Sequence, residues 1–345
     1  MAQPVDARRV RLVADHDEHA HDLLELLVPL AVRGLAAAYH PRQRTFAQTL
    51  RAHRTPTGLQ LRPEGTNLRY AAMAALGIAR LDEADQRTIL CGDSLDDLLD
   101  AIARQAAEHP DHGAVALSAW ALAEVAGRWD ARLSSRLEAF LLGDGPMPTV
   151  DVSWTLTAAL AGSRLTDTRA LVMSAANKVV NAQGAGGLFP HWMRPAARDR
   201  WRGHVGSFAD QVYPLQALAR LFSWSGDKAH LEASTTVADR LCALQGAAGQ
   251  WWWHYDARTG AVVEPYPVYS VHQHAMAPMV LFDLVEAGGT DHAGAVAAGL
   301  TWLTAHPEVM EELVSERHPV VWRKVGRREP PKAARAVAAA VTSLA

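Results

Sequence analysis

The sequence predicts an all-α protein whose helical hairpins close into an α/α toroid of five to six hairpins. Apolar residues recur with the 3.6-residue period of a helix along most of the chain, and the strong helix formers Ala and Leu fill many of these positions. Helices that are apolar on nearly every side alternate with helices that carry one charged face, as buried inner and solvated outer helices would. Closing this array into a ring covers the ends that an open stack would expose.

The same periodicity gives the individual elements. It places helices at residues 16–38, 67–80, 94–108, 112–127, 130–142, 151–162, 166–182, 207–224, 227–245, 270–287, 290–305 and 332–344. The inner helices start near residues 67, 112, 151, 207 and 270, where polar or aromatic residues precede the apolar stretch. These starts lie about 40–60 residues apart, which indicates a repeated two-helix unit with connecting loops of variable length. Strand-like runs are few, and prolines interrupt the best one, "AVVEPYPVYS".

Composition fits a globular protein with a large core. The chain has 345 residues, of which 49% are hydrophobic and 21% charged. We expect one toroid domain over residues 1–310 and a basic C-terminal extension with a terminal helix over residues 311–345. A net charge of −3 gives no reason to expect nucleic acid or an anionic membrane as partner. Cys91 and Cys242 lie far apart and are expected to be free thiols.

Neither a transmembrane segment nor the apolar core of a signal peptide is found, so we expect a cytoplasmic protein. The sequence leaves the oligomeric state open.

Two predicted outer helices end in the same way. The segments "NAQGAGGLFPHW" and "ALQGAAGQWWW" both contain Gln-x3-Gly-x-aromatic. This pattern resembles the Q-x-G-x-W repeat of the terpenoid cyclase and protein prenyltransferase superfamily. The hairpin "FADQVYPLQALARLFSWSGDKAHLEAS" resembles those of six-hairpin glycosidases and sugar epimerases. The resemblance covers about residues 65–305, implies an α/α toroid, and assigns Trp251 to packing on the next hairpin.

A functional site is expected at the end of the toroid where the inner helices begin, because unpaired N–H groups and polar side chains gather there. The long loops 184–206 and 246–269 lie at the same end. The candidate catalytic residues are Asp151, Asp210, Tyr213, Tyr269 and His272. The candidate substrate-binding residues are Asn67, Arg69, Tyr70, His112, Trp154, His191, Arg194, Trp252, Trp253, His254 and Tyr266.

Indoles beside hydrogen-bonding groups suit a sugar, which has apolar faces and many hydroxyls. We therefore expect a carbohydrate-active enzyme that acts by acid/base chemistry on a glycan or sugar acid in the toroid cavity, without metal or cofactor. The reaction would be hydrolysis, epimerisation or elimination, as in glycoside hydrolases, sugar epimerases or polysaccharide lyases. Asp151 and Asp210 would serve hydrolysis, which usually needs two carboxylates. The Tyr and His candidates would serve proton abstraction, with Arg69 or Arg194 holding the acid group.

Two alternatives remain open: a terpenoid cyclase-like or prenyl-binding protein, and a non-catalytic binding toroid. The first lacks the D-x-D-D acid motif, because Ser153 and Trp154 follow Asp151 where aspartates are required. The segment "DDLLD" at residues 96–100 matches a metal-binding motif, but acidic residues also favour the first turn of a helix. We expect these aspartates to be exposed. Likewise, Asn67 and Asp151 are ordinary helix-capping residues.

Overall fold

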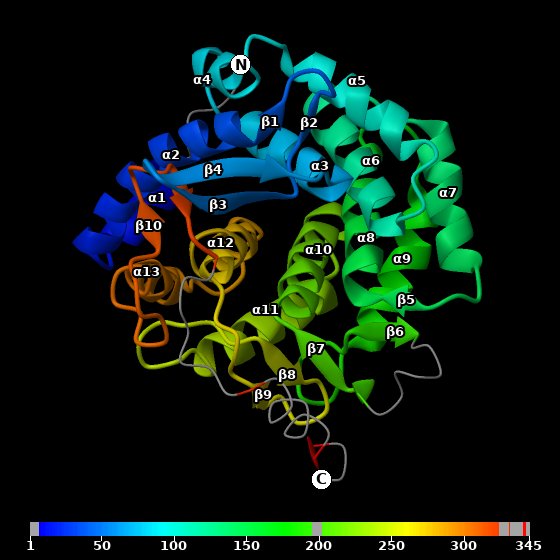
Figure 1. Cartoon of the computed structure of the whole chain (residues 1–345). Helices are drawn as coiled ribbons and strands as arrows, with labels where there is room; N and C mark the ends of the chain where they lie inside the picture. Colours follow the sequence, from blue (N-terminus) through cyan, green and yellow to red (C-terminus); the bar gives the residue numbers. More distant parts are fainter. Residues whose placement is uncertain (1–6, 195–201, 324–330, 332–340, 343–345) are drawn as a thin grey trace.

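The computed structural model describes residues 7–194, 202–323, 331 and 341–342. Its inner helices are α3 (Leu68–Ile78), α6 (His112–Ala126), α8 (Thr149–Gly162), α10 (Ala209–Ser225) and α12 (Ala277–Glu286). A π-helical turn, η2 (His272–Met276), precedes α12. Each inner helix packs on the next in this order, around a common axis (Figure 1). The five inner helices start close to the predicted positions, and the fold is an α/α toroid.

The outer helices lie on the perimeter (Figure 1). They are α5 (Leu95–Ala106), α7 (Ala131–Leu142), α9 (Arg169–Ala182), α11 (Lys228–Ala243) and α13 (Ala293–Thr301). A short helix, α4 (Glu83–Ile89), precedes α5. The sequence pattern predicted the five outer helices but missed α4, because seven residues give too short a period to detect.

A sixth hairpin closes the ring. Helices α1 (Ala7–Ala14) and α2 (Glu18–Ala38) pack on each other and on α13. Arg9 of α1 also pairs with Asp283, at 2.9 Å, and with Glu286 of α12. The described residues therefore form six hairpins, the upper end of the predicted range. Helix α1 was not predicted, since its polar sequence resembles a charged N-terminal segment.

Two of the inner helices, α6 and α8, are buried on nearly all sides. In α6 every residue from Gly113 to Ala123 is buried, and in α8 all but one residue is buried. Capping side chains stabilise the first turns of α3 and α6. Asn67 accepts hydrogen bonds from the backbone of α3, and Asp111 accepts one from the backbone of Ala114 in α6. These caps fix the inner helices at the end where the predicted site residues lie.

The glutamines of the repeat join neighbouring hairpins. Gln183 donates hydrogen bonds to the carbonyls of Gly187 and Ala233, and Gln245 donates to those of Gly249 and Ala295. Both glycines have positive φ angles, +79° and +86°, which favour glycine over other residues. Trp251 is 1% exposed, packs on Phe208 of its own hairpin, and donates its backbone N–H to Gln273 at the start of the next hairpin. Trp251 thus occupies the structural place that the resemblance implied.

Small antiparallel sheets decorate the toroid, and the sequence pattern missed nearly all of them. Three strands build a sheet beside the start of α10: β7 (Val205–Ser207), β8 (His254–Asp256) and β9 (Val262–Glu264). The others are two-stranded: β1 (Tyr39–His40) with β2 (Thr45–Phe46), β3 (Thr49–Thr55) with β4 (Gly58–Glu64), β5 (Met147–Pro148) with β6 (Trp192–Arg194), and β10 (Val314–Ser315) with β11 (Val320–Val321). Only β9 lies in the run "AVVEPYPVYS".

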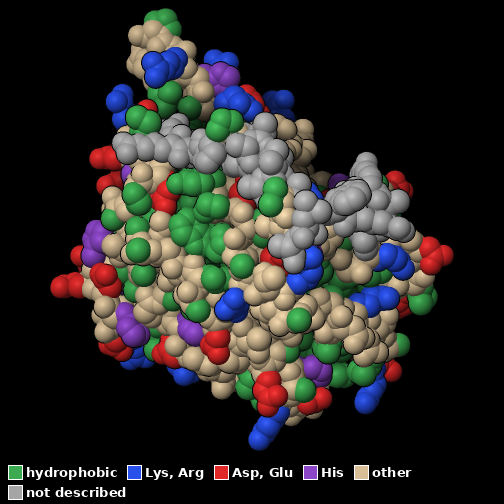
Figure 2. Space-filling view, turned by 90° about the horizontal axis from the view of Figure 1, so that it is seen from below, with side chains coloured by type: hydrophobic (Ala, Val, Ile, Leu, Met, Phe, Trp, Pro, Cys, Tyr) green, Lys and Arg blue, Asp and Glu red, His purple; other side chains and the backbone are tan. Residues whose placement is uncertain are grey.

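The C-terminal extension begins with the β10–β11 hairpin, which packs on α2. The helix expected at residues 332–344 falls almost wholly outside the described residues, so the division at residue 310 stays a prediction. Among the described helices, none combines the length and apolar character needed to cross a membrane. Figure 2 shows hydrophobic side chains close together on the lower face, with charges of both signs around them.

The aspartates of "DDLLD" lie on the first turns of the outer helix α5. Asp96 and Asp100 are exposed, and Arg128 pairs with Asp100 at 2.6 Å. Asp97 forms a capping box with Ser94 and pairs with Arg44 at 3.0 Å. These contacts explain the acidic cluster as a helix start.

Candidate active site

Three charged side chains meet where three inner helices begin. Arg69, in the first turn of α3, donates from Nε to Asp111, the N-cap of α6, at 2.7 Å. The same guanidinium lies 3.1 Å from Oδ1 of Asp151, in the first turn of α8. It also lies over the Trp154 ring, 5.0 Å from the ring centre. Arg69 therefore holds two carboxylates together over an indole face.

Asp151 differs from Asp111 in its proton affinity. Burial raises the pKa of Asp151 to about 6, although Arg69 opposes this shift. Asp111 raises it further, and His191 lowers it. For Asp111, burial also favours the protonated form, but the hydrogen bonds from Arg69 outweigh it and keep the pKa below its usual value. One carboxyl of the pair is thus poised to release a proton near neutral pH, and the other stays ionised.

The close approach of Arg69 and Asp151 requires a glycine. Gly113, in the first turn of α6, has no side chain, and a Cβ there would overlap both Asp151 Oδ1 and the Arg69 guanidinium. The backbone of α6 therefore leaves the space in which the ion pair sits.

A histidine–aspartate pair lies next to Asp151. Asp210, in the first turn of α10, is fully buried, and its carboxylate lies 3.0 Å from Nδ1 of His191. The backbone N–H and hydroxyl of Ser207 both donate to the same carboxylate oxygen, at 2.7 Å. The His191 side chain is 48% exposed. Asp210 thus orients the imidazole and holds its Nδ1 side, while much of the ring faces solvent.

Aromatic rings form a neighbouring wall. Trp253 stacks on His272 with ring centres 5.7 Å apart and meets the edge of Tyr269 at 4.8 Å. Arg323, from the C-terminal extension, lies over the Tyr269 ring at 4.1 Å. Trp252 behaves differently: its Nε1 donates to the carbonyl of Leu244 at 2.7 Å, so this indole packs on the end of α11. Of the three consecutive tryptophans, Trp253 is the one whose ring contacts both Tyr269 and His272.

The wall and the histidine–aspartate pair occupy the same positions in the two repeats. The backbone N–H of Phe189 donates to Gln211, and that of Trp251 donates to Gln273. His191 follows Phe189 by two residues, as Trp253 follows Trp251, and each contacts the residue before the glutamine, Asp210 or His272. The first repeat carries the ionisable pair His191–Asp210 where the second has the aromatic stack of Trp253 on His272.

Several other candidates lie around this centre. Tyr213 is buried and meets the Trp154 ring edge-on at 4.8 Å, and burial raises its pKa. Tyr70 is 43% exposed and lies near Tyr213. His254 pairs with Glu264 at 2.9 Å, and burial lowers its pKa. Burial keeps the Tyr213 phenol protonated, so the phenolate that would act as a base is disfavoured there.

The side chains of the remaining candidates make other contacts. His112 stacks on Phe140 of the outer helix α7, with ring centres 4.5 Å apart. Arg194 donates from Nε to the carbonyl of Gly145 at 2.7 Å and also bonds to Gly143. Asn67 caps α3, and Tyr266 lies half-buried in the loop after β9. The structure therefore does not bring Arg194 to the cluster, where it was expected to hold an acid group.

Sequence reasoning also missed residues that complete the centre: Asp111, Gly113, Ser207 and, as the partner of His254, Glu264. Asp111 was overlooked because an aspartate before a helix is an ordinary cap. The segment "DHG" at residues 111–113 did contain a signal. A glycine weakens a helix, so its presence in a buried helix indicates that another group must approach the backbone closely there.

Comparisons with known proteins agree with the geometry of the fold. No protein-family model matches this chain, and no curated protein matches it. Among solved structures, the chain is similar to a crystal structure of an unsaturated glucuronyl hydrolase specific for heparin. That similarity has a TM-score of 0.59 at 13% sequence identity and covers 89% of this chain and 90% of the other. At this identity, the likeness establishes a shared fold over nearly the whole length of both chains.

Proposed function

We propose that this protein is a carbohydrate-active enzyme that hydrolyses a uronate-containing glycan at the end of the toroid where the inner helices begin. The observation that carries the proposal is the buried carboxyl of Asp151, whose pKa of about 6 suits a proton donor at physiological pH. The solved structure of a glucuronyl hydrolase with the same fold supports a uronate as the sugar.

Each group of the cluster has a role in this proposal. Asp151 protonates the substrate where the bond is to break, and Arg69 with Asp111 keeps the carboxyl in place. His191, oriented by Asp210, accepts a proton from the water that adds to the sugar. The water supplies one hydrogen and one hydroxyl to the products, so no other reactant is required. Trp253 offers an indole face for a sugar ring.

This assignment changes the role first expected for Asp210. The carboxylate is fully buried and accepts hydrogen bonds from Ser207 and His191, so it acts through the imidazole and does not touch substrate. It is a positioning residue. The base is then an imidazole, so hydrolysis needs no second carboxylate in contact with the sugar.

The charged cluster favours a sugar over a prenyl chain, because desolvating charged groups against a hydrocarbon ligand is unfavourable. A terpenoid cyclase-like protein remains the alternative, and a non-catalytic toroid that binds a glycan is the third. These three functions predict different products.

The proposal is tested by incubating the purified protein with three substrate classes: unsaturated uronyl oligosaccharides, saturated uronides and prenyl diphosphates. Products are identified by mass spectrometry, and loss of the conjugated double bond is followed by ultraviolet absorbance. We expect hydrolysis of a uronide to fall by about 100-fold or more in Asp151→Asn. The matched control, Asp96→Asn on the exposed start of α5, should keep wild-type activity. Turnover of prenyl diphosphates, or glycan binding without turnover, would favour the second or third function instead.

A further inference from the structure

Two adjoining cavities lie beside α9, and none of the candidate catalytic residues lines either of them. One, of about 540 Å³, lies between α9 and the β5–β6 pair, and the other, of about 440 Å³, lies between α9 and the junction of α10 and α11. Asn177 and Asn181 line both. The two cavities therefore adjoin at these asparagines, and we call them together the α9 groove.

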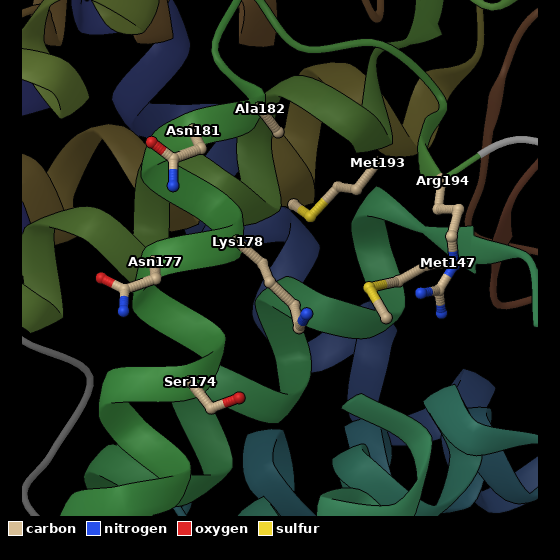
Figure 3. A pocket seen from close by; sticks show the side chains of 8 residues that line it. All are labelled: Met147, Ser174, Asn177, Lys178, Asn181, Ala182, Met193 and Arg194. Carbon is tan, nitrogen blue, oxygen red and sulfur yellow. The ribbon is translucent and has the colours of Figure 1, made fainter. Parts of the chain in front are cut away.

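Basic side chains line both ends of the α9 groove. Lys178 and Arg194 lie at one end, where Figure 3 shows both reaching toward Met147. Arg169 and His230 lie at the other end. The carboxylate in the lining, Asp227, already accepts a hydrogen bond from Ala229 as the cap of α11. The groove is thus locally basic on a chain of net charge −3, which suits an anionic ligand.

Apolar faces and amides lie between the charges. Trp224 is 37% exposed and Met173 is 45% exposed, although both are large hydrophobic side chains. Asn177 and Asn181 are exposed and stand one helical turn apart, so their amides can bond to successive groups of one ligand. An indole face beside amides fits a sugar ring, which offers C–H faces and hydroxyls together.

We infer that the α9 groove is a second, non-catalytic binding site for an acidic oligosaccharide. Trp224 stacks on a sugar ring, the asparagines bond to hydroxyls, and Lys178 with Arg194 pairs with carboxylate or sulfate groups. The inference rests on the proposed function, because a groove of this kind would hold the distal part of a long substrate on the enzyme. Short substrates would not reach it.

Binding is measured by calorimetry with a heparin-derived octasaccharide, at low and moderate salt. The double variant Lys178→Ala/Trp224→Ala should weaken binding by at least about tenfold, as loss of one anchoring aromatic or cation commonly does. The matched control is Arg87→Ala, which removes an exposed cation on α4. Hydrolysis of a disaccharide should be unchanged in the double variant, and its melting temperature should show that the fold is intact.

Unchanged octasaccharide binding in the double variant would overturn the inference. Equal binding of a single-stranded oligonucleotide would also overturn it, because the groove would then be a general polyanion surface. The same titration with Asp151→Asn separates this site from the active site. Groove binding that persists without turnover of any glycan would leave the inference standing and reject the proposed function.

Discussion

Replacing Asp151 by asparagine should change how the stability of the protein depends on pH. In the unfolded chain this carboxyl titrates near its ordinary pKa of 3.8, and burial raises the pKa to about 6 in the folded protein. A raised pKa means that folding favours the protonated form. The stability that this carboxyl contributes to the folded protein is therefore fully present below about pH 4, and it is lost as pH rises through about 6. A difference of roughly 2 units corresponds to about 3 kcal/mol.

The assay is urea denaturation of the wild type and Asp151→Asn at several pH values between about 4 and 7. The free energy of unfolding of the wild type, relative to the variant, should fall by up to about 3 kcal/mol over this range. Asp130→Asn, at the N-cap of α7, is the control: because the hydrogen bond from Arg132 lowers the pKa of Asp130, the stability that Asp130 contributes is present above about pH 4 and is lost only in stronger acid. A flat difference between wild type and Asp151→Asn would refute the assigned proton affinity.

Four further substitutions test other parts of the structure. Trp251→Ala should lower the free energy of unfolding by about 3–5 kcal/mol. Trp253→Ala should weaken glycan binding with little loss of stability. If both variants lose the same stability and still bind glycan, this distinction is wrong. Gly113→Ala should reduce activity by displacing Arg69 or Asp151, even though alanine stabilises a helix relative to glycine by up to about 1 kcal/mol. A variant with wild-type kinetics would show that the glycine is not needed for the placement of these side chains. Asp210→Asn should lower kcat and shift its pH dependence, with KM nearly unchanged; a change in stability alone would assign Asp210 to packing.

The fold could be predicted because the hydrophobic periodicity of the sequence distinguishes inner from outer helices. Inner helices such as α6 and α8 are apolar on every side, and outer helices such as α5 carry one polar face, so the sequence shows the two layers directly. Elements too short for a period were missed: α4 has seven residues, and β5 has two. The β3–β4 hairpin was missed because its side chains are mostly exposed and carry little hydrophobic alternation.

The gathering of the candidate residues was predictable, but the way in which they pair was not. The ends of the inner helices identified Asp151, Asp210 and Arg69, since polar side chains there are visible in the sequence. The bond between His191 and Asp210 joins side chains that lie 19 residues apart in the sequence, and no local pattern encodes such a pairing. Arg194 was assigned to the site because its loop leads there, yet its guanidinium turns to the carbonyls of residues 143 and 145.

The measurement that tests the central claim most directly is the pH dependence of kcat/KM for hydrolysis of a uronide by the wild type and by Asp151→Asn. If Asp151 donates the proton, the wild-type rate should fall as pH rises above about 6, because the free enzyme then loses the acid form. Asp151→Asn should retain 1% or less of the activity, as loss of a general acid commonly costs about 100-fold or more, and its residual rate should lack this fall. A variant with wild-type activity, or the same decline above pH 6 in both proteins, would contradict the assignment of Asp151 as the proton donor.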